Sequence, residues 1–114
     1  MRSFAQALDL KDDPALIRRY LELHRKVWPE VVEALRAIGI QRMKIYLLGT
    51  RLFMYAEARD GFDPRRDYQG YLLSPRCREW DELMRRMQQP APGAREGEWW
   101  AMMREVFDLE AAGA

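Results

Sequence analysis

Two neighbouring segments near the middle of the chain place the strongest constraint on the fold. Gln41–Leu48 and Arg51–Ala58 alternate between apolar and polar side chains, and only Gly49-Thr50 separates them. Such alternation is typical of half-buried strands, and a two-residue connection with glycine is typical of a β-hairpin. One face of the first strand is expected to carry Met43, Ile45 and Leu47, and the other Arg42, Lys44, Tyr46 and Leu48. The sequence therefore predicts an antiparallel sheet built around this hairpin.

The residues before the hairpin predict one strand and an interrupted helix. Ser3–Leu10 alternates loosely, which predicts a strand with its larger apolar side chains on one side. A helix is expected to begin at Pro14, capped by the preceding aspartates, and to run to Trp28. Pro29 lacks an N–H and pushes the residue before it towards an extended conformation, so we expect a break there. A second helical stretch then starts at Pro29 and ends at Gly39.

The residues after the hairpin predict two more helices and a last strand. Asp63–Leu73 is expected to form a short helix, and Ser74 to cap a clearer one that starts at Pro75. The inward face of that second helix is predicted to carry Cys77, Trp80, Leu83, Met84 and Met87. Pro90–Gly97 is rich in proline and glycine and indicates a loop. Trp99–Leu109 is apolar and compatible with a strand.

The predicted order of elements defines a fold class. Strand, helix, strand, strand, helix, strand is the order of the ferredoxin-like, or split βαβ, α+β fold. Its helices cover one face of an antiparallel sheet and leave the other face open. A second copy of the same sheet is the expected cover, so we expect a homodimer. The 114 residues are expected to form one domain, 1–114, with a frayed tail at 110–114.

Composition excludes several classes of function. The 19 basic and 18 acidic residues are spread along the chain, so no basic face for nucleic acid is expected. No apolar run approaches the ~20 residues of a membrane span, and no signal peptide is recognisable. Cys77 is the only cysteine and His24 the only histidine, which predicts neither an internal disulfide nor a metal site. A cytoplasmic location is the resulting expectation.

The lone histidine and a nearby tyrosine are the best candidates for chemistry. Tyr20 and His24 are four residues apart, so they share one face of the predicted helix, and that face is otherwise apolar. An imidazole exchanges protons near neutral pH without any cofactor, because its unperturbed pKa is about 6.5. The pattern therefore predicts a general acid/base pair. A lone histidine on an apolar helix face also occurs as an ordinary core residue, and the spacing alone leaves both interpretations open.

Other aromatic and acidic residues form a looser set of candidates. No phosphate-binding glycine loop and no nucleophile motif is present. Tyr46 and Tyr55 on the hairpin, with Trp80 on a later helix, would suit stacking on a sugar or on a flat ring. Glu57 and Glu105 are possible carboxylate partners. Tyrosines are also common in strands for packing reasons, and the helical spacing of Trp80 equally fits a core position.

The ordered set of short motifs resembles the L-rhamnose mutarotase family. The resemblance covers Phe4 to Leu109 and rests on Tyr20-x-x-x-His24, Trp28-Pro29-Glu30, Lys44-Ile45-Tyr46-Leu47, Leu52-Phe53, Cys77-Arg78-Glu79-Trp80 and Glu105-Val106-Phe107. It implies a ferredoxin-like chain that dimerises through its sheets into a dimeric α+β barrel. It also implies an isomerase that interconverts the α and β anomers of a 6-deoxy-L-sugar without metal or cofactor.

The resemblance also implies roles for individual residues. Tyr20 and His24 fall on the family's site tyrosine and histidine, and Trp80 falls on its helix tryptophan, a sugar-contacting residue. Asp81 stands where the family often has a second tryptophan, and Met43 stands where it has a further site tyrosine. These two departures change the wall that contacts the sugar, because a changed hydroxyl demands changed polar contacts. Both L-rhamnose and L-fucose therefore remain as predicted substrates.

Two other functions fit the same sequence features. Dimeric α+β barrels include cofactor-independent monooxygenases, which could use the same histidine and tryptophan on a flat aromatic substrate. A non-catalytic module that only binds a small ligand is the second alternative. Oxygen consumption would favour the first, and binding without anomer exchange would favour the second.

Overall fold

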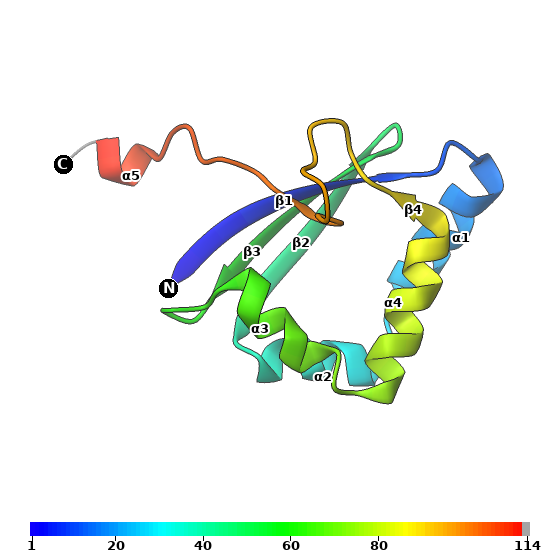
Figure 1. Cartoon of the computed structure of the whole chain (residues 1–114), viewed down its shortest axis with the longest axis horizontal. Helices are drawn as coiled ribbons and strands as arrows, with labels where there is room; N and C mark the ends of the chain where they lie inside the picture. The colour runs from blue at the N-terminus through cyan, green and yellow to red at the C-terminus, as the bar shows by residue number, and fades with distance from the viewer. Residues whose placement is uncertain (113–114) are drawn as a thin grey trace.

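The computed structural model describes residues 1–112, which form an antiparallel sheet covered on one face by helices (Figure 1). The elements are β1 (Arg2–Leu10), α1 (Pro14–Arg25), α2 (Pro29–Ala37), β2 (Ile40–Leu48), β3 (Arg51–Ala58), α3 (Pro64–Tyr71), α4 (Pro75–Met87), β4 (Gln88–Gln89), β5 (Ala101–Met102) and α5 (Leu109–Ala112). The strand order is β2-β3-β1-β4, with β5 also paired to β1. This order confirms the predicted ferredoxin-like α+β fold.

Strand alternation separates the sheet into an inner face against the helices and an open face. The inner face of β1 carries Phe4, Leu8 and Leu10, which are almost fully buried. On the open face, Tyr55 of β3 pairs with Ala5 of β1. The other open-face residues of the hairpin are Arg42, Lys44, Tyr46, Leu48, Arg51, Phe53 and Glu57. The predicted division of β2 into two faces is therefore confirmed.

Two apolar clusters fill the space between the sheet and the helices. The larger one brings α1, α2 and α4 against the sheet, and it includes Leu10, Tyr20, Leu52, Cys77, Trp80 and Met84. The smaller one lies beneath α3 and includes Phe4, Ile40, Ala56, Ala58 and Phe62.

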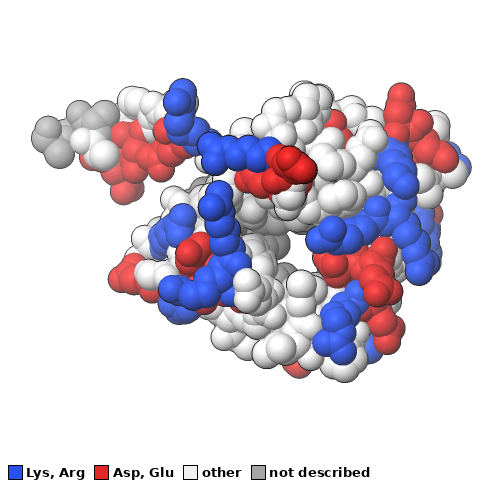
Figure 2. All heavy atoms as spheres, viewed as in Figure 1, with Lys and Arg blue, Asp and Glu red and all other residues white. Residues whose placement is uncertain are grey.

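Basic and acidic side chains intermingle on the face of the molecule shown in Figure 2. No helix within residues 1–112 is long and apolar enough to cross a membrane.

The first helix ends earlier than predicted. It was expected to run to Trp28, but α1 stops at Arg25, and Lys26 has non-helical backbone angles. Trp28 is extended, with φ −56° and ψ 134°, and it directly precedes the proline that starts α2. The steric effect of Pro29 on the residue before it explains this break. The second helical stretch ends as expected at the glycine, Gly39, which has a positive φ of 113°.

The last predicted strand is mostly wrong. Only Ala101–Met102 of the predicted Trp99–Leu109 strand pairs with β1, opposite Gln6 and Ala7. A short unpredicted strand, β4, occupies the β1 edge next to it, opposite Asp9 and Leu10. Each of these strands therefore has only part of the β1 edge to pair with. Residues 103–108 leave the body of the protein as an exposed arm (Figure 1).

The structure differs from the predicted frayed tail in the first three residues of that tail, which are helical. Within the expected tail at 110–114, Glu110–Ala112 belong to α5, a single helical turn that starts at Leu109. The side chain of Asp108 accepts hydrogen bonds from the N–H groups of Glu110 and Ala111, which caps this turn. Gly113 and Ala114 lie outside the described residues.

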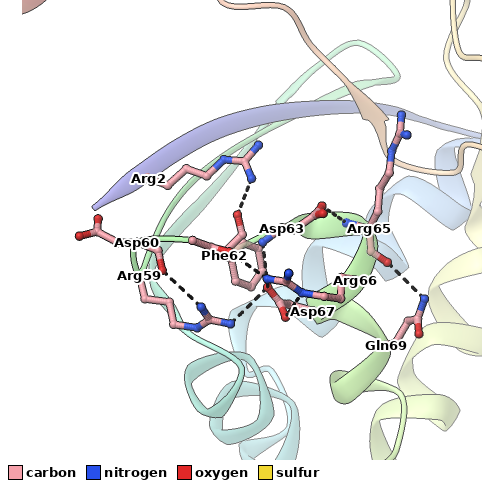
Figure 3. A network of polar contacts seen from close by, with 10 residues as sticks. Arg2, Arg59, Asp60, Phe62, Asp63, Arg65, Arg66, Asp67 and Gln69 are labelled. Atoms are coloured by element: carbon pink, nitrogen blue, oxygen red, sulfur yellow. Dashed lines mark hydrogen bonds and ion pairs between the residues drawn. The ribbon is translucent and has the colours of Figure 1, made fainter.

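An ion-pair network fixes the connection between β3 and α3 (Figure 3). Asp67 on α3 accepts hydrogen bonds from Arg66 and from the N–H of Asp63, and it pairs with Arg59 at 3.2 Å. These hydrogen bonds lower the pKa of the Asp67 carboxyl from 3.8 to about 2. The bonds from Arg66 have the largest effect, and the bond from the Asp63 N–H has the next largest. Arg2 of β1 also donates to the Phe62 carbonyl, so the network joins three parts of the chain.

Asp67→Asn is expected to make the protein less stable at neutral pH and less sensitive to acid. The lowered pKa means that Asp67 contributes stability above its unfolded pKa, near 3.8, and loses it as pH falls towards 2. The difference in melting temperature between parent and Asp67→Asn should therefore narrow as pH falls from about 4 to about 2. Thermal melts across this range test it, with the exposed Asp12→Asn as control. An unchanged difference across the range would contradict the prediction.

Candidate functional site

The predicted pair, Tyr20 and His24, lies together on the inward side of α1. Asp13 caps this helix through bonds to the Ala15 and Leu16 N–H groups, and Pro14 occupies its first position. The two rings are one helical turn apart, with their centroids 4.2 Å from each other. Tyr20 is buried at 3% exposure, whereas His24 is half-buried. The imidazole therefore sits at the edge of the core, next to a phenol.

The imidazole of His24 is oriented by one hydrogen bond. Nδ1 lies 2.8 Å from the backbone carbonyl oxygen of Tyr20. A carbonyl only accepts, so Nδ1 carries the proton and donates it. In the neutral ring, Nε2 is then the nitrogen with a free lone pair. Burial lowers the pKa of His24 below 6.5, partly offset by the Tyr20 carbonyl, so the ring is neutral at pH 7 and can act as a base.

The phenol of Tyr20 lies at the end of a buried chain of polar contacts. Trp99 donates from Nε1 to Gln88 Oε1 at 2.8 Å, and Gln88 donates from Nε2 to the Tyr20 hydroxyl oxygen at 3.5 Å. Because Gln88 donates to that oxygen, the proton of the phenol is free to be donated elsewhere. Burial raises the pKa of Tyr20 to about 12, opposed by the bond from Gln88. Tyr20 is therefore a neutral hydrogen-bond donor at physiological pH.

Two tryptophans complete the aromatic cluster. The ring of Trp80 on α4 lies edge-on to His24 at 5.5 Å and edge-on to Trp28 at 5.1 Å, measured between centroids. The guanidinium of Arg76 covers the outer face of Trp28 at 3.9 Å from its centroid. Trp80 is only 6% exposed and belongs to the larger apolar cluster. Its contact with His24 fits a site role, and its burial fits a core role.

A hollow of about 470 Å³ is lined by Trp99, which is linked to Tyr20 through Gln88, whereas Tyr20, His24 and Trp80 themselves do not line it. Its walls come from the start of α3 and from the 95–102 segment, and they are lined by Gln6, Pro64, Arg65, Arg95, Glu96, Gly97, Glu98, Trp99, Trp100 and Met102. Figure 2 shows a depression at the centre of this face, with charged side chains on its rim. Trp100 lines the hollow and also packs against the cluster that contains Tyr20 and Trp80. The volume lies within the range of small-molecule sites, roughly 300–1,000 Å³.

Glu98 holds the outer wall of the hollow in shape. Its carboxylate accepts hydrogen bonds from the N–H groups of Arg95 and Met102. These two bonds lower the pKa of Glu98, and the bond from the Arg95 N–H has the larger effect. The positive charge of Arg65 also lowers this pKa. The side chain of Arg65 extends from α3 towards this segment (Figure 3). The wall is therefore braced by a carboxylate that stays ionised at neutral pH.

The two positions where the sequence departs from the family pattern lie apart from each other. Met43 is half-buried on the inner face of β2 and packs against the smaller apolar cluster, not the cluster of Tyr20 and Trp80. Asp81 lies on α4 next to Trp80, and its carboxylate pairs with Arg85 at 2.9 Å. Neither Met43 nor Asp81 lines the hollow, so their contact with a sugar stays a prediction.

Tyr46 and Tyr55 do not lie with Tyr20, His24 and Trp80 within one chain, and their predicted contact with substrate stays a prediction. Both lie on the open face of the sheet, on the side opposite the helices, where they line a second hollow, of about 480 Å³, with Arg42, Lys44 and Phe53. Tyr55 donates to Glu57 at 2.7 Å on the same face. Glu105 lies in the exposed arm. Strand parity is the reason, because residues one apart on a strand point to opposite faces.

The chain is similar to known proteins over nearly its whole length. A family model described as L-rhamnose mutarotase matches residues 3–109. The chain belongs to the L-rhamnose mutarotase family. A protein of the UPF0734 group from Dictyostelium discoideum is 54% identical, covering 96% of this chain and 90% of that protein. An L-fucose mutarotase from Xanthomonas campestris pv. campestris is 38% identical, covering 98% of this chain and 91% of that protein.

A solved structure shows the same fold in another member of the family. The crystal structure of an L-rhamnose mutarotase from Formosa agariphila superposes with a TM-score of 0.70 at 19% identity, covering 96% of this chain and 99% of that one. This likeness confirms the ferredoxin-like fold of the mutarotase family for the chain. Within residues 1–112, no group of three histidine, cysteine, aspartate or glutamate side chains could hold a metal ion.

Several site residues of this family member were not predicted from its sequence. Gln88 contacts Tyr20, and Trp99 and Trp100 line the hollow. The sequence predicted the two tryptophans as the start of a strand, and in the structure both are half-buried, with Trp100 packed against the larger cluster. Gln6 was assigned only to a strand. Its position among Phe4, Leu8 and Leu10 on the inner face was the one available signal, because a polar residue there is unusual.

Proposed function

We propose that this protein is a mutarotase that interconverts the α and β anomers of a 6-deoxy-L-sugar, with His24 as the base. The observation that carries the proposal is the paired orientation of the two side chains. His24 offers a free Nε2 on a neutral imidazole, and Tyr20 offers a free O–H on a neutral phenol. Membership of the L-rhamnose mutarotase family supports the same reaction.

The proposed reaction needs two proton transfers and no bond to the protein. His24 Nε2 takes the proton of the anomeric hydroxyl, and that oxygen becomes the aldehyde oxygen. The bond between the anomeric carbon and the ring oxygen breaks, and the ring oxygen takes the proton of the Tyr20 phenol. Rotation about the bond next to the aldehyde carbon exposes its other face. The reverse transfers close the ring as the other anomer, and both side chains return to their starting states.

The sugar class is the finer part of the proposal. Trp99 and Trp100 offer apolar faces, and Arg65, Arg95 and Glu98 offer polar groups around the same hollow, which suits a monosaccharide. Met43 and Asp81 replace residues that the family pattern places at the sugar wall. L-Fucose and L-rhamnose are both 6-deoxy-L-sugars and differ in the configuration of two hydroxyls. The 38% identity with an L-fucose mutarotase supports including L-fucose.

Saturation-transfer NMR between the two anomeric protons tests the proposed function. The exchange rate of L-fucose, L-rhamnose and their epimers is measured with and without protein at micromolar concentration. We expect the anomers of at least one 6-deoxy-L-sugar to exchange faster when protein is present. The acceleration should be proportional to the protein concentration. No acceleration for any of these sugars would contradict the proposal. Oxygen consumption with an aromatic substrate would instead favour the monooxygenase interpretation.

We propose that the protein is a homodimer that pairs through the open face of the sheet. Tyr46 is 53% exposed, Leu48 85% and Phe53 36%, so this face presents apolar area to water. The arm adds Val106 and Phe107, which are also exposed. Large apolar side chains exposed on an uncovered sheet face are typical of an interface between copies. We also propose a cytoplasmic location, since the lone cysteine is buried and free.

Leu48→Glu is expected to weaken the dimer by placing a charge where an exposed apolar side chain at the end of β2 contacts the partner copy. Light scattering of the parent should give twice the chain mass of 13.6 kDa, and the variant should shift towards the monomer at micromolar concentration. Leu73→Glu is a matched control, because Leu73 is similarly exposed at 80% but lies between α3 and α4. A parent that is monomeric, or a Leu48→Glu variant that stays fully dimeric, would contradict the proposed interface.

A further inference from the structure

Gln6 is a buried polar side chain that the proposed mechanism does not use. It lies in the middle of β1 on the inner face and is 6% exposed. Its neighbours across the sheet are Met54 on β3 and Met102 on β5. An amide between two methionines is costly to bury unless its polar atoms find partners. Its presence there therefore points to a role beyond packing.

One half of the Gln6 amide is satisfied and fixes the orientation of the other half. Nε2 donates to the backbone carbonyl oxygen of Trp100 at 3.1 Å. The opposite orientation would place the amide oxygen against that carbonyl oxygen, and two acceptors repel each other. Oε1 is therefore a pure acceptor, and among residues 1–112 no side chain or backbone group donates to it. A buried acceptor of this kind requires a donor from outside the chain.

Gln6 is also one of the residues that line the hollow. Trp99, Trp100 and Met102 line it together with Gln6, and the pairing of β5 with β1 holds these residues beside one another. The same 100–102 segment supplies both the carbonyl that orients the amide and an aromatic wall. The donor that Oε1 lacks can thus come from a molecule in the hollow. Sugar hydroxyls are donors of the right kind and size.

We propose that Gln6 is a specificity-determining residue, with Oε1 accepting a hydrogen bond from one hydroxyl of the bound sugar. This inference rests on the proposed function and goes beyond it by assigning the residue that distinguishes sugars. L-Rhamnose and L-fucose differ in configuration at C2 and C4, so an acceptor fixed in the pocket meets the hydroxyl of one sugar and misses that of the other. The mismatched sugar leaves the acceptor unpaired, which lowers its reactivity.

Gln6→Met tests the proposal, since methionine has a similar length, fits between Met54 and Met102, and lacks the acceptor. The value of kcat/KM for anomer exchange is measured for L-fucose and L-rhamnose in parent and variant. We expect about a tenfold fall for the preferred sugar and a much smaller change for the other, because a single hydrogen bond is lost. Gln89→Met is the matched control. Its Nε2 also donates to a backbone carbonyl, that of Leu10, but Gln89 is not among the residues lining the hollow.

The outcomes separate this inference from the proposed function. If the parent is active and Gln6→Met keeps the parent preference between the two sugars, the proposed role of Gln6 is overturned. Oε1 is then assigned to a bound water instead. A parent that accelerates neither sugar overturns both proposals. Melting temperatures are measured alongside, and a structural role alone would change them without changing the preference. If Gln6→Met does not fold, Gln6→Asn replaces it, because it withdraws the acceptor by one carbon and predicts the same loss of preference.

Discussion

Trp80→Ala is expected to lower the free energy of unfolding by about 3–5 kcal/mol, which is typical for truncation of a buried tryptophan. The side chain is 6% exposed and packs among Tyr20, Cys77, Met84 and other members of the larger cluster. Its loss leaves a cavity between α1 and α4 that the surrounding rings cannot fill. Chemical denaturation of parent and variant measures the loss directly.

A matched variant separates the packing role of Trp80 from a role in sugar binding. Trp28 contacts the same ring at 5.1 Å but is half-buried, so Trp28→Ala should cost clearly less stability than Trp80→Ala. Sugar titrations on both variants are run below their melting temperatures. A Trp80→Ala protein with parent stability and no sugar binding would show that the indole serves the sugar alone. Because Trp80 is buried, we expect its truncation to lower the free energy of unfolding whether or not it also weakens sugar binding.

His24→Ala is expected to reduce the protein-dependent rate of anomer exchange by roughly 10²-fold or more, with the fold retained. The substitution removes the only imidazole of the chain and the only Nε2 lone pair beside Tyr20. Tyr20 does not replace it, because a phenol with a pKa of about 12 stays protonated at neutral pH. Saturation-transfer NMR on the preferred sugar measures the rate, and a thermal melt confirms the fold.

His24→Gln is the conservative companion of that variant. Glutamine keeps a hydrogen-bonding group near the Tyr20 carbonyl but does not exchange protons near neutral pH. It should therefore bind sugar with an affinity close to that of the parent and fail to catalyse. If either His24 variant folds, binds sugar and exchanges anomers at the parent rate, His24 is a structural residue.

The element order could be predicted because local signals and tertiary packing agree. Pro14, Pro29, Pro64 and Pro75 each stand at the start of a helix, and Asp13, Asp63 and Ser74 provide caps. The Gly49-Thr50 connection needs a residue with positive φ, and Gly49 supplies it at 61°. These features depend on neighbours in sequence, so the sequence alone reveals them.

The last predicted strand failed for a reason that the sequence does not contain. Val106 and Phe107 have the composition of a strand, but a strand forms only where a partner edge is available. The edge of β1 is already shared by β4 and β5. Both side chains therefore remain exposed in the arm, at 83% and 67%.

The candidate site was partly predictable. Helical spacing alone brings Tyr20 and His24 together, as predicted. Strand parity places Tyr46 on the open face, away from Met43 and Ile45 on the same strand. Strand parity places Gln6 on the inner face of β1 but does not reveal its partner, and Gln88 carries no such signal. Their contacts depend on how the 95–102 segment folds back over the sheet, which is a tertiary feature.

The pH dependence of anomer exchange in the parent protein tests most directly whether the neutral imidazole of His24 is the base. Burial lowers the pKa of His24 below 6.5. The protein-dependent rate, corrected for the rate in buffer, should rise with pH through that lowered pKa and then level off. His24→Gln should show no such rise. A parent rate that is independent of pH from about 4.5 to about 7.5, or a rise that persists in His24→Gln, would contradict the proposed mechanism.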